Sequence, residues 1–143
     1  MIEESMIRKK FIKGYDCSQV VLSYFAERLG ITEEMANKVS ACFGGGMMHG
    51  DTCGAFTGAI MAVGLKYGHC EVEHMGQKDI MNAKRAEFLQ KFQEKYAVCN
   101  CKGLLKHDIS KLEEMQKILD EGLLFDFCPE VVKDSITILK EIF

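Results

Sequence analysis

Cysteine stands out in this chain of 143 residues, which contains seven of them. Cysteine thiolates bind soft metals, hold iron–sulfur clusters and exchange disulfides. In a reducing compartment such a number points to metal binding or redox chemistry rather than to a disulfide scaffold. A free cysteine can also be a small buried hydrophobe, which is the interpretation we favour for Cys42 and Cys70.

A glycine-rich stretch, residues 42–55, gives Cys53 the most distinctive setting. It holds five of the 13 glycines, which permit tight turns and positive φ angles. Asp51 or Thr52 can cap a helix that begins near Cys53, which puts the sulfur beside free backbone N–H groups and the positive end of a helix dipole. That setting favours the thiolate and predicts a reactive or metal-binding sulfur. His49 is a further candidate ligand or proton carrier, although an exposed loop histidine needs no such role.

Cys17 and Cys128 have similar predicted settings. Asp16 is a good helix cap, and Cys17 follows it on the apolar stripe of the helix that it starts. Cys128 precedes Pro129, which is favoured in the first turn of a helix, and Cys128 also continues an inward-facing stripe. Three helix starts that point at one place, with Cys53 as the third, would form a locally positive pocket suited to thiolates or to an anionic cluster.

Cys101, or alternatively Cys99, can complete a set of four with Cys17, Cys53 and Cys128. Four thiolates are the usual ligands of a 2Fe–2S or 4Fe–4S cluster and also of structural zinc. We therefore expect an iron–sulfur cluster or another metal site on these cysteines, with Cys99 or His49 as further candidate ligands. The same four sulfurs could instead act as redox thiols without a metal.

Apolar residues at helical spacing, separated by glycines and polar turns, predict helices and no strand. The expected helices cover residues 2–13, 17–29, 33–43, 53–67, 78–96, 111–120 and 128–143. The predicted fold class is all-α, a single compact bundle of about six or seven helices that forms one domain over residues 1–143. The helix at 33–43 is expected to turn Met35, Val39 and Phe43 inward. The helix at 53–67 is rich in small residues, which predicts close packing against a neighbouring helix.

Composition and charge narrow the function classes. Hydrophobic residues make up 48% of the chain and charged residues 27%, which is the balance of a folded globular protein. The formal net charge is −3 and no basic block is present, which argues against a nucleic-acid partner. The acidic N-terminal residues lack an apolar signal region, which predicts a cytoplasmic protein. The longest apolar stretch, residues 55–65, is too short and too rich in glycine to be embedded across a membrane.

Several segments resemble a known family. Residues 53–58 read Cys-Gly-Ala-Phe-Thr-Gly, which fits a Cys-Gly-Ala-x-x-Gly signature. Residues 16–19 read Asp-Cys-Ser-Gln, Cys101 stands before a pair of leucines, and Cys128 stands before a pair of valines. Together these segments resemble the C_GCAxxG_C_C family of putative redox-active proteins, which has four characteristic cysteines. The resemblance extends from about Cys17 to the last helix.

The resemblance implies that Cys17, Cys53, Cys101 and Cys128 are the functional set, with redox activity as their role. The remaining cysteines would then be extras: Cys42, Cys70 and Cys99. The family's association with transporter genes implies a redox partner in a transporter-linked system. No residue implies catalytic turnover, so the sequence makes no prediction of enzymatic activity.

Three functions are consistent with the sequence. The first is an iron–sulfur or similar metal-cluster protein. The second is a cluster-free thiol/disulfide redox protein, in which Cys53 attacks and a neighbouring thiol resolves. The third is a structural zinc domain or adaptor, although the chain is long enough to fold without a metal. The disulfide pairing, the redox partner and the formation of a homodimer stay open.

Overall fold

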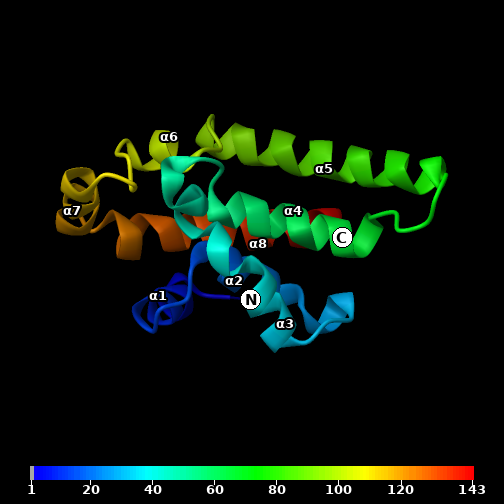
Figure 1. Cartoon of the computed structure of the whole chain (residues 1–143), viewed down its shortest axis with the longest axis horizontal. Coiled ribbons are helices and arrows are strands. Elements are labelled where there is room, and N and C mark those ends of the chain that lie inside the picture. The colour runs from blue at the N-terminus through cyan, green and yellow to red at the C-terminus, as the bar shows by residue number, and fades with distance from the viewer. Residues whose placement is uncertain (1) are drawn as a thin grey trace.

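The computed structural model describes residues 2–143 and contains eight α-helices and no strand in that range (Figure 1). The helices are α1 (Glu4–Ile12), α2 (Cys17–Phe25), α3 (Glu33–Ser40), α4 (Gly54–Tyr67), α5 (Met75–Tyr96), α6 (Cys101–Leu105), α7 (Leu112–Asp120) and α8 (Cys128–Ile142). The all-α prediction is confirmed, but the expected number of helices was too low. The missing helix is α6, whose five residues are too few to show a helical repeat of apolar side chains.

Local sequence signals fix several helix starts. Asp16 and Gln19 form a capping box at the start of α2, in which the Gln19 side-chain oxygen accepts from the Asp16 N–H at 2.9 Å. Thr32 caps α3 by accepting from the Met35 N–H at 3.0 Å. Helix α8 begins at Cys128 and carries a proline in its first turn, as predicted.

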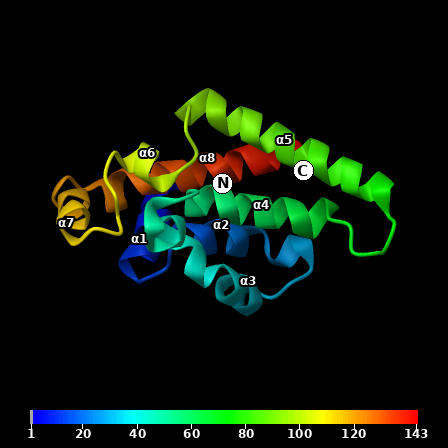
Figure 2. The same cartoon turned by 45° about the horizontal axis from the view of Figure 1, so that its top comes forward.

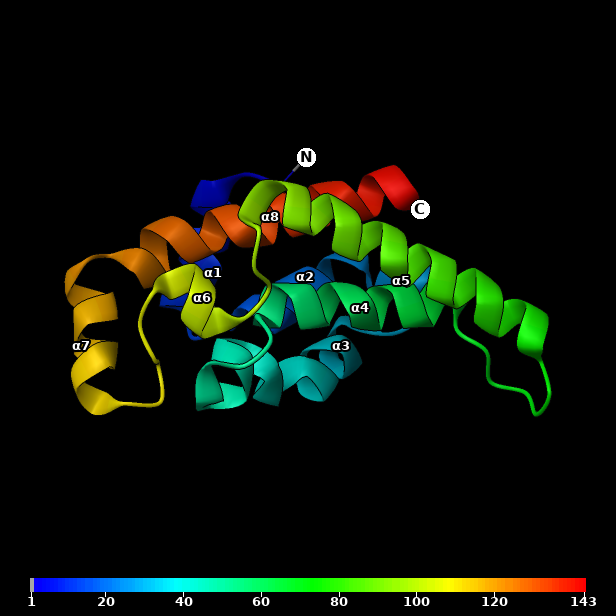
Figure 3. The same ribbon diagram turned by 90° about the horizontal axis from the view of Figure 1, so that it is seen from above.

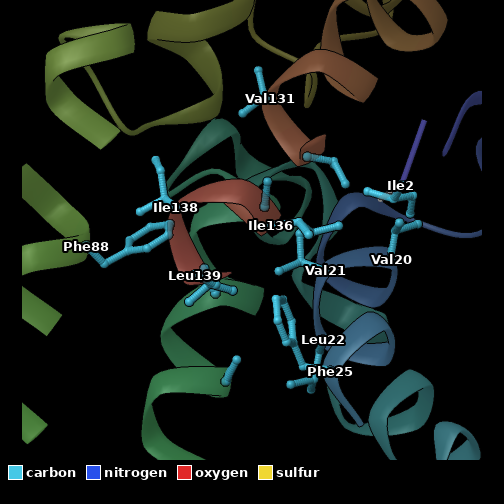
Figure 4. Close-up of a cluster of buried hydrophobic side chains, with 14 of the residues drawn as sticks. Ile2, Val20, Val21, Leu22, Phe25, Phe88, Val131, Ile136, Ile138 and Leu139 are labelled. Atoms are coloured by element: carbon cyan, nitrogen blue, oxygen red, sulfur yellow. The ribbon is translucent and has the colours of Figure 1, made fainter. Parts of the chain in front are cut away.

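The main hydrophobic core lies between α2, α4, α5 and α8. Figure 4 shows Leu22 and Phe25 of α2 gathered near Leu139 of α8, with Phe88 of α5 at the edge of the group. All four side chains are almost completely buried. None of the helices in residues 2–143 combines the length and the apolar character that crossing a lipid bilayer requires.

Helix α4 packs very closely against α2, as its small residues predict (Figure 2). A Cβ atom on Gly58 of α4 would lie 2.7 Å from the carbonyl oxygen of Ser18 and 3.1 Å from its Cα atom. Ala55 and Ala59 are fully buried on the same helix. The close approach fixes the start of α2 beside the start of α4, where two of the candidate cysteines lie.

The face of α3 that turns inward differs from the prediction. Met35 and Val39 are 57% and 53% exposed, whereas Ala36 and Ser40 are buried. Small side chains occupy the inner face because α3 lies close to α2. The Ser18 hydroxyl of α2 donates to the Ser40 carbonyl oxygen at 2.8 Å, which leaves no room for a large side chain between the helices.

Helices α6 and α7 lie at one end of the molecule, and the N-terminal end of α5 lies at the other (Figures 1 and 3). A second, smaller hydrophobic cluster forms there from Cys101, Leu105, Ile109 and Ile118. The half-buried segment η4 (Leu123–Phe127) leads from α7 into α8. Its last residue packs against both clusters, so this end of the molecule is joined to the main core near the start of α8.

Candidate functional site

Backbone hydrogen bonds tie the segment before α4 to the segment before α6. The Cys53 N–H donates to the Cys99 carbonyl oxygen at 2.8 Å. The Cys101 N–H donates to the Asp51 carbonyl oxygen at 2.6 Å, and an isolated antiparallel bridge lies between the two bonds. Two stretches that are far apart in the sequence are therefore held in one register, which sets Cys53 and Cys101 near each other.

Four cysteines line one cavity of about 220 Å³: Cys17, Cys53, Cys101 and Cys128. Three of them are the first residues of α2, α6 and α8, and Cys53 is the N-cap of α4. The sequence predicted a helix start at three of these cysteines and placed Cys101 in a loop. The structure therefore places on one cavity wall the four cysteines that the family resemblance implies.

The Cys17 and Cys53 side chains interact within this cavity. The pKa of Cys17 is raised well above its ordinary value, first by its hydrogen bond with Cys53 and then by burial. The Gly45 N–H donates to the Cys17 sulfur and lowers the pKa of Cys17, but this effect is smaller than the two that raise it. Cys17 therefore keeps its proton at neutral pH.

Two glycines of the Cys-Gly-Ala-x-x-Gly signature make this contact possible. A Cβ atom on Gly54 would overlap the Cys17 Sγ atom and would lie 2.9 Å from the Phe43 carbonyl oxygen. One turn later, Gly58 admits the backbone of the helix that carries Cys17. Gly54 thus makes room for the Cys17 sulfur, and Gly58 makes room for the α2 backbone. A side chain at either position would occupy the space that the neighbour needs.

Burial governs the two remaining cavity thiols. It raises the pKa of Cys101 to about 11, with smaller contributions from Cys17 and Asp108. Burial also raises the pKa of Cys128 far above its ordinary value. The expected preference for thiolates at helix starts is not found at Cys128, where burial raises the pKa, or at Cys17, where the interaction with Cys53 and then burial raise it.

The rest of the cavity wall is mostly apolar. Within the described part of the chain, Asp16 is the single charged residue that lines it. The Asp16 carboxyl packs against Gly44, where a Cβ atom would lie 2.6 Å from its Cγ atom, and this partial burial raises its pKa. Met48 and Met115 also line the wall, so six sulfur-containing side chains face one space. The sequence interpretation missed both methionines, and the only available signal was the place of Met48 within the glycine run.

A left-handed turn brings the glycine-rich segment to the cavity. Gly45, Gly46, Met47 and Met48 have φ angles of 64°, 60°, 57° and 56°. Each of the two methionines costs about 1 kcal/mol or more in this conformation, which persists only where the surroundings impose it. The turn directs the Gly45 N–H to Cys17 and places Met48 on the cavity wall.

The other candidate residues lie away from the cavity. His49 is exposed, and half-buried Cys99 supplies a backbone carbonyl rather than a part of the wall. The interpretation of Cys42 and Cys70 as buried hydrophobes is wrong, because both are exposed. All seven cysteines are free thiols. Within residues 2–143, no three His, Cys, Asp or Glu side chains lie close enough together to hold one metal ion.

Comparison with known proteins identifies the family of this chain. A family model described as "Putative redox-active protein (C_GCAxxG_C_C)" matches residues 15–142, a range that includes every cysteine at the cavity. No curated protein and no solved structure matches the chain. The chain therefore belongs to the C_GCAxxG_C_C family of putative redox-active proteins.

Proposed function

We propose that Cys17 and Cys53 form a cluster-free dithiol–disulfide redox centre. The position of both cysteines on one cavity wall, where their side chains interact, supports this proposal, because a disulfide forms only between sulfurs that are already within reach. On oxidation the pair loses two electrons and two protons and gains one S–S bond, while a partner disulfide becomes two thiols. Cys101 and Cys128 stand on the same cavity wall as further exchange partners.

An iron–sulfur cluster on all four cysteines is the second candidate. It is favoured by the convergence of four thiols on one mostly apolar cavity, a donor set and a surrounding that suit such a cluster. Cys17, Cys53, Cys101 and Cys128 would hold it, and when bound it would supply one-electron transfer. The raised pKa values of Cys17, Cys101 and Cys128 would make cluster binding depend on pH, because each ligand must lose its proton.

Both candidates suit a reducing compartment, and we place the protein in the cytoplasm on the basis of its cysteine content. By family association, its redox partner would belong to a transporter-linked system. Structural zinc stays as a third candidate, although within residues 2–143 no three potential ligand side chains lie close enough together to hold one ion.

Purification without oxygen, followed by a visible spectrum and assays of iron, sulfide and zinc, separates these candidates. We expect colourless, metal-free protein in which mild oxidation joins Cys17 to Cys53, as read from a peptide map. Brown protein with sulfide in near-stoichiometric amount would establish the cluster instead. Zinc alone, retained after treatment with reductant, would establish the structural role.

The Cys53→Ser variant tests which sulfurs carry the chemistry. We expect it to lose the two-electron titration of the pair and to keep its helix content, because the Cys53 N–H still reaches the Cys99 carbonyl oxygen. The matched controls are Cys42→Ser and Cys70→Ser, which remove exposed thiols outside the cavity and should leave the titration intact. Full redox capacity in Cys53→Ser would contradict the proposal.

A further inference from the structure

The cavity limits what can reach the proposed redox pair. Its volume of about 220 Å³ is somewhat larger than the cavity of about 150 Å³ that takes up benzene in an engineered protein. A linear molecule of about eight to ten non-hydrogen atoms is therefore the size that fits. The disulfide of a folded protein, or a large peptide disulfide such as glutathione disulfide, is too large to enter a space of this volume.

The charge of the lining limits the substrate further. Among the described residues that line the cavity, Asp16 is the single charged one, and no Lys, Arg or His faces the space. Gly14, Tyr15, Asp16 and Met48 are the exposed members of the lining, so they form its mouth. An anionic substrate would therefore pass the Asp16 carboxylate and would find no positive side chain inside to replace its hydration.

We propose that the cavity receives a small, uncharged disulfide and that the Cys17–Cys53 pair reduces it. This inference rests on the dithiol function proposed above and adds the class of substrate. It follows from three features of one space: a thiol pair on its wall, a volume that fits a small molecule, and apolar surroundings with one carboxylate at the mouth.

The reaction balances with the disulfide as the oxidant. The Cys53 sulfur attacks one sulfur of the substrate R–S–S–R, the substrate S–S bond breaks, and the first RSH leaves with the proton released from Cys53. The Cys17 thiol then gives up its proton and its sulfur attacks the Cys53 sulfur of the mixed disulfide. The second RSH leaves, the Cys17–Cys53 disulfide remains, and two electrons have passed from the protein to the substrate.

The test measures how fast three disulfides oxidise the reduced protein. The probes are bis(2-hydroxyethyl) disulfide, which is small and neutral, dithiodiglycolate, which is small and dianionic, and glutathione disulfide, which is large and anionic. The protein carries Cys42→Ser and Cys70→Ser, so that no exposed thiol reacts. Formation of the Cys17–Cys53 disulfide is followed by mass spectrometry, and each rate is divided by the rate of the same probe with dithiothreitol. We expect the neutral probe to exceed each of the others by about tenfold or more.

Two variants tie the preference to the cavity. Leu124→Trp fills part of the space and should slow the neutral probe about tenfold, whereas Leu123→Trp, at the neighbouring half-buried residue outside the lining, should not. Asp16→Asn replaces the carboxylate by an amide that also caps a helix well. It should reduce the difference in oxidation rate between the neutral and the dianionic probe. Circular dichroism of each variant checks that the helices persist.

The outcomes separate the substrate inference from the proposed function. If the Cys17–Cys53 disulfide forms but the dianionic probe or glutathione disulfide matches the neutral probe, the inference about the substrate is overturned and the dithiol function stands. The same holds if Leu124→Trp folds and reacts as fast as Leu123→Trp. If no probe forms the Cys17–Cys53 disulfide, the dithiol function fails and the substrate inference fails with it.

Discussion

Each cavity thiol is subject to two opposing influences. Its place at a helix start favours the thiolate, because unpaired N–H groups and the helix dipole stabilise negative charge there. Its place in an apolar wall favours the neutral thiol. At Cys101 burial prevails and the pKa rises to about 11, so the folded protein holds a neutral thiol at this position at pH 7. Acquiring charge at Cys101 therefore requires an added stabilising partner such as a bound metal.

The raised pKa of Cys101 predicts a loss of stability in alkali. Below the ordinary pKa of 9.0 the thiol is neutral in both the folded and the unfolded chain. The contribution of the Cys101 thiol to the free energy of unfolding is therefore fully present there. Between pH 9.0 and about 11 the unfolded chain releases this proton and the folded chain keeps it, which favours unfolding. We expect the free energy of unfolding to fall by about 1–2 kcal/mol from this group across that range, measured by urea titration.

The Cys101→Ala variant is the control for this pH dependence. It retains every other titrating group, so the difference between its stability profile and that of the wild type isolates Cys101. The variant should start from a lower stability because it loses a buried sulfur. Parallel profiles between pH 9 and 11 would show that Cys101 titrates at its ordinary pKa in the folded protein.

At the scale of the elements, the register of α4 against α2 decides whether the redox pair exists. Gly54→Ala places a methyl group where the Cys17 sulfur lies. We expect the two helix starts to separate, with a loss of about 1–3 kcal/mol in the free energy of unfolding and a clear drop in Cys17–Cys53 disulfide formation. Urea unfolding and peptide mapping measure the two effects.

A double-mutant comparison makes the cause specific. Cys17→Ala removes the sulfur that the new methyl group would meet, so Gly54→Ala should cost much less in that background. Gly64→Ala is the matched control on the same helix, since a Cβ atom there meets nothing within 4 Å. It should be neutral or stabilising by up to about 1 kcal/mol, because alanine favours the helix. An equal cost of Gly54→Ala with and without the Cys17 sulfur would exclude this clash as the cause.

All the helices except α6 could be predicted from the sequence, because capping residues and apolar repeats are local signals. The choice of Cys101 over Cys99 as the fourth cysteine depended on the family resemblance. Asp16 and Pro129 marked two of the cysteine helices correctly. The inner face of α3 could not be predicted, because which side turns inward depends on the close approach of α2. The cavity itself could not be predicted either, since the bond from the Cys101 N–H to Asp51 joins segments with no local signal for each other.

At the scale of the whole molecule, the cavity lies where the two hydrophobic clusters meet. Cys17 and Cys53 pack against the main core, Cys101 belongs to the smaller cluster, and Cys128 packs against both. The smaller cluster has few buried side chains, so the end of the molecule that contains α6 and α7 should open at a lower free-energy cost than the main core. Such opening would widen the cavity without unfolding α2, α4 or α8.

Ile118→Ala tests whether this end of the molecule opens on its own. Ile118 is fully buried in the smaller cluster, so its truncation should cost about 2–4 kcal/mol, mostly in the stability of α6 and α7. We expect hydrogen exchange in α6 and α7 and alkylation of Cys101 to accelerate about tenfold or more, while the slowest amides of α2 and α8 change little. The control is Val63→Ala, which truncates a side chain of the main core and should instead accelerate exchange in α2 and α8. If Ile118→Ala accelerates all the helices equally, the two clusters unfold as one unit, and access to the cavity must depend on the turn at Gly45 to Met48 instead.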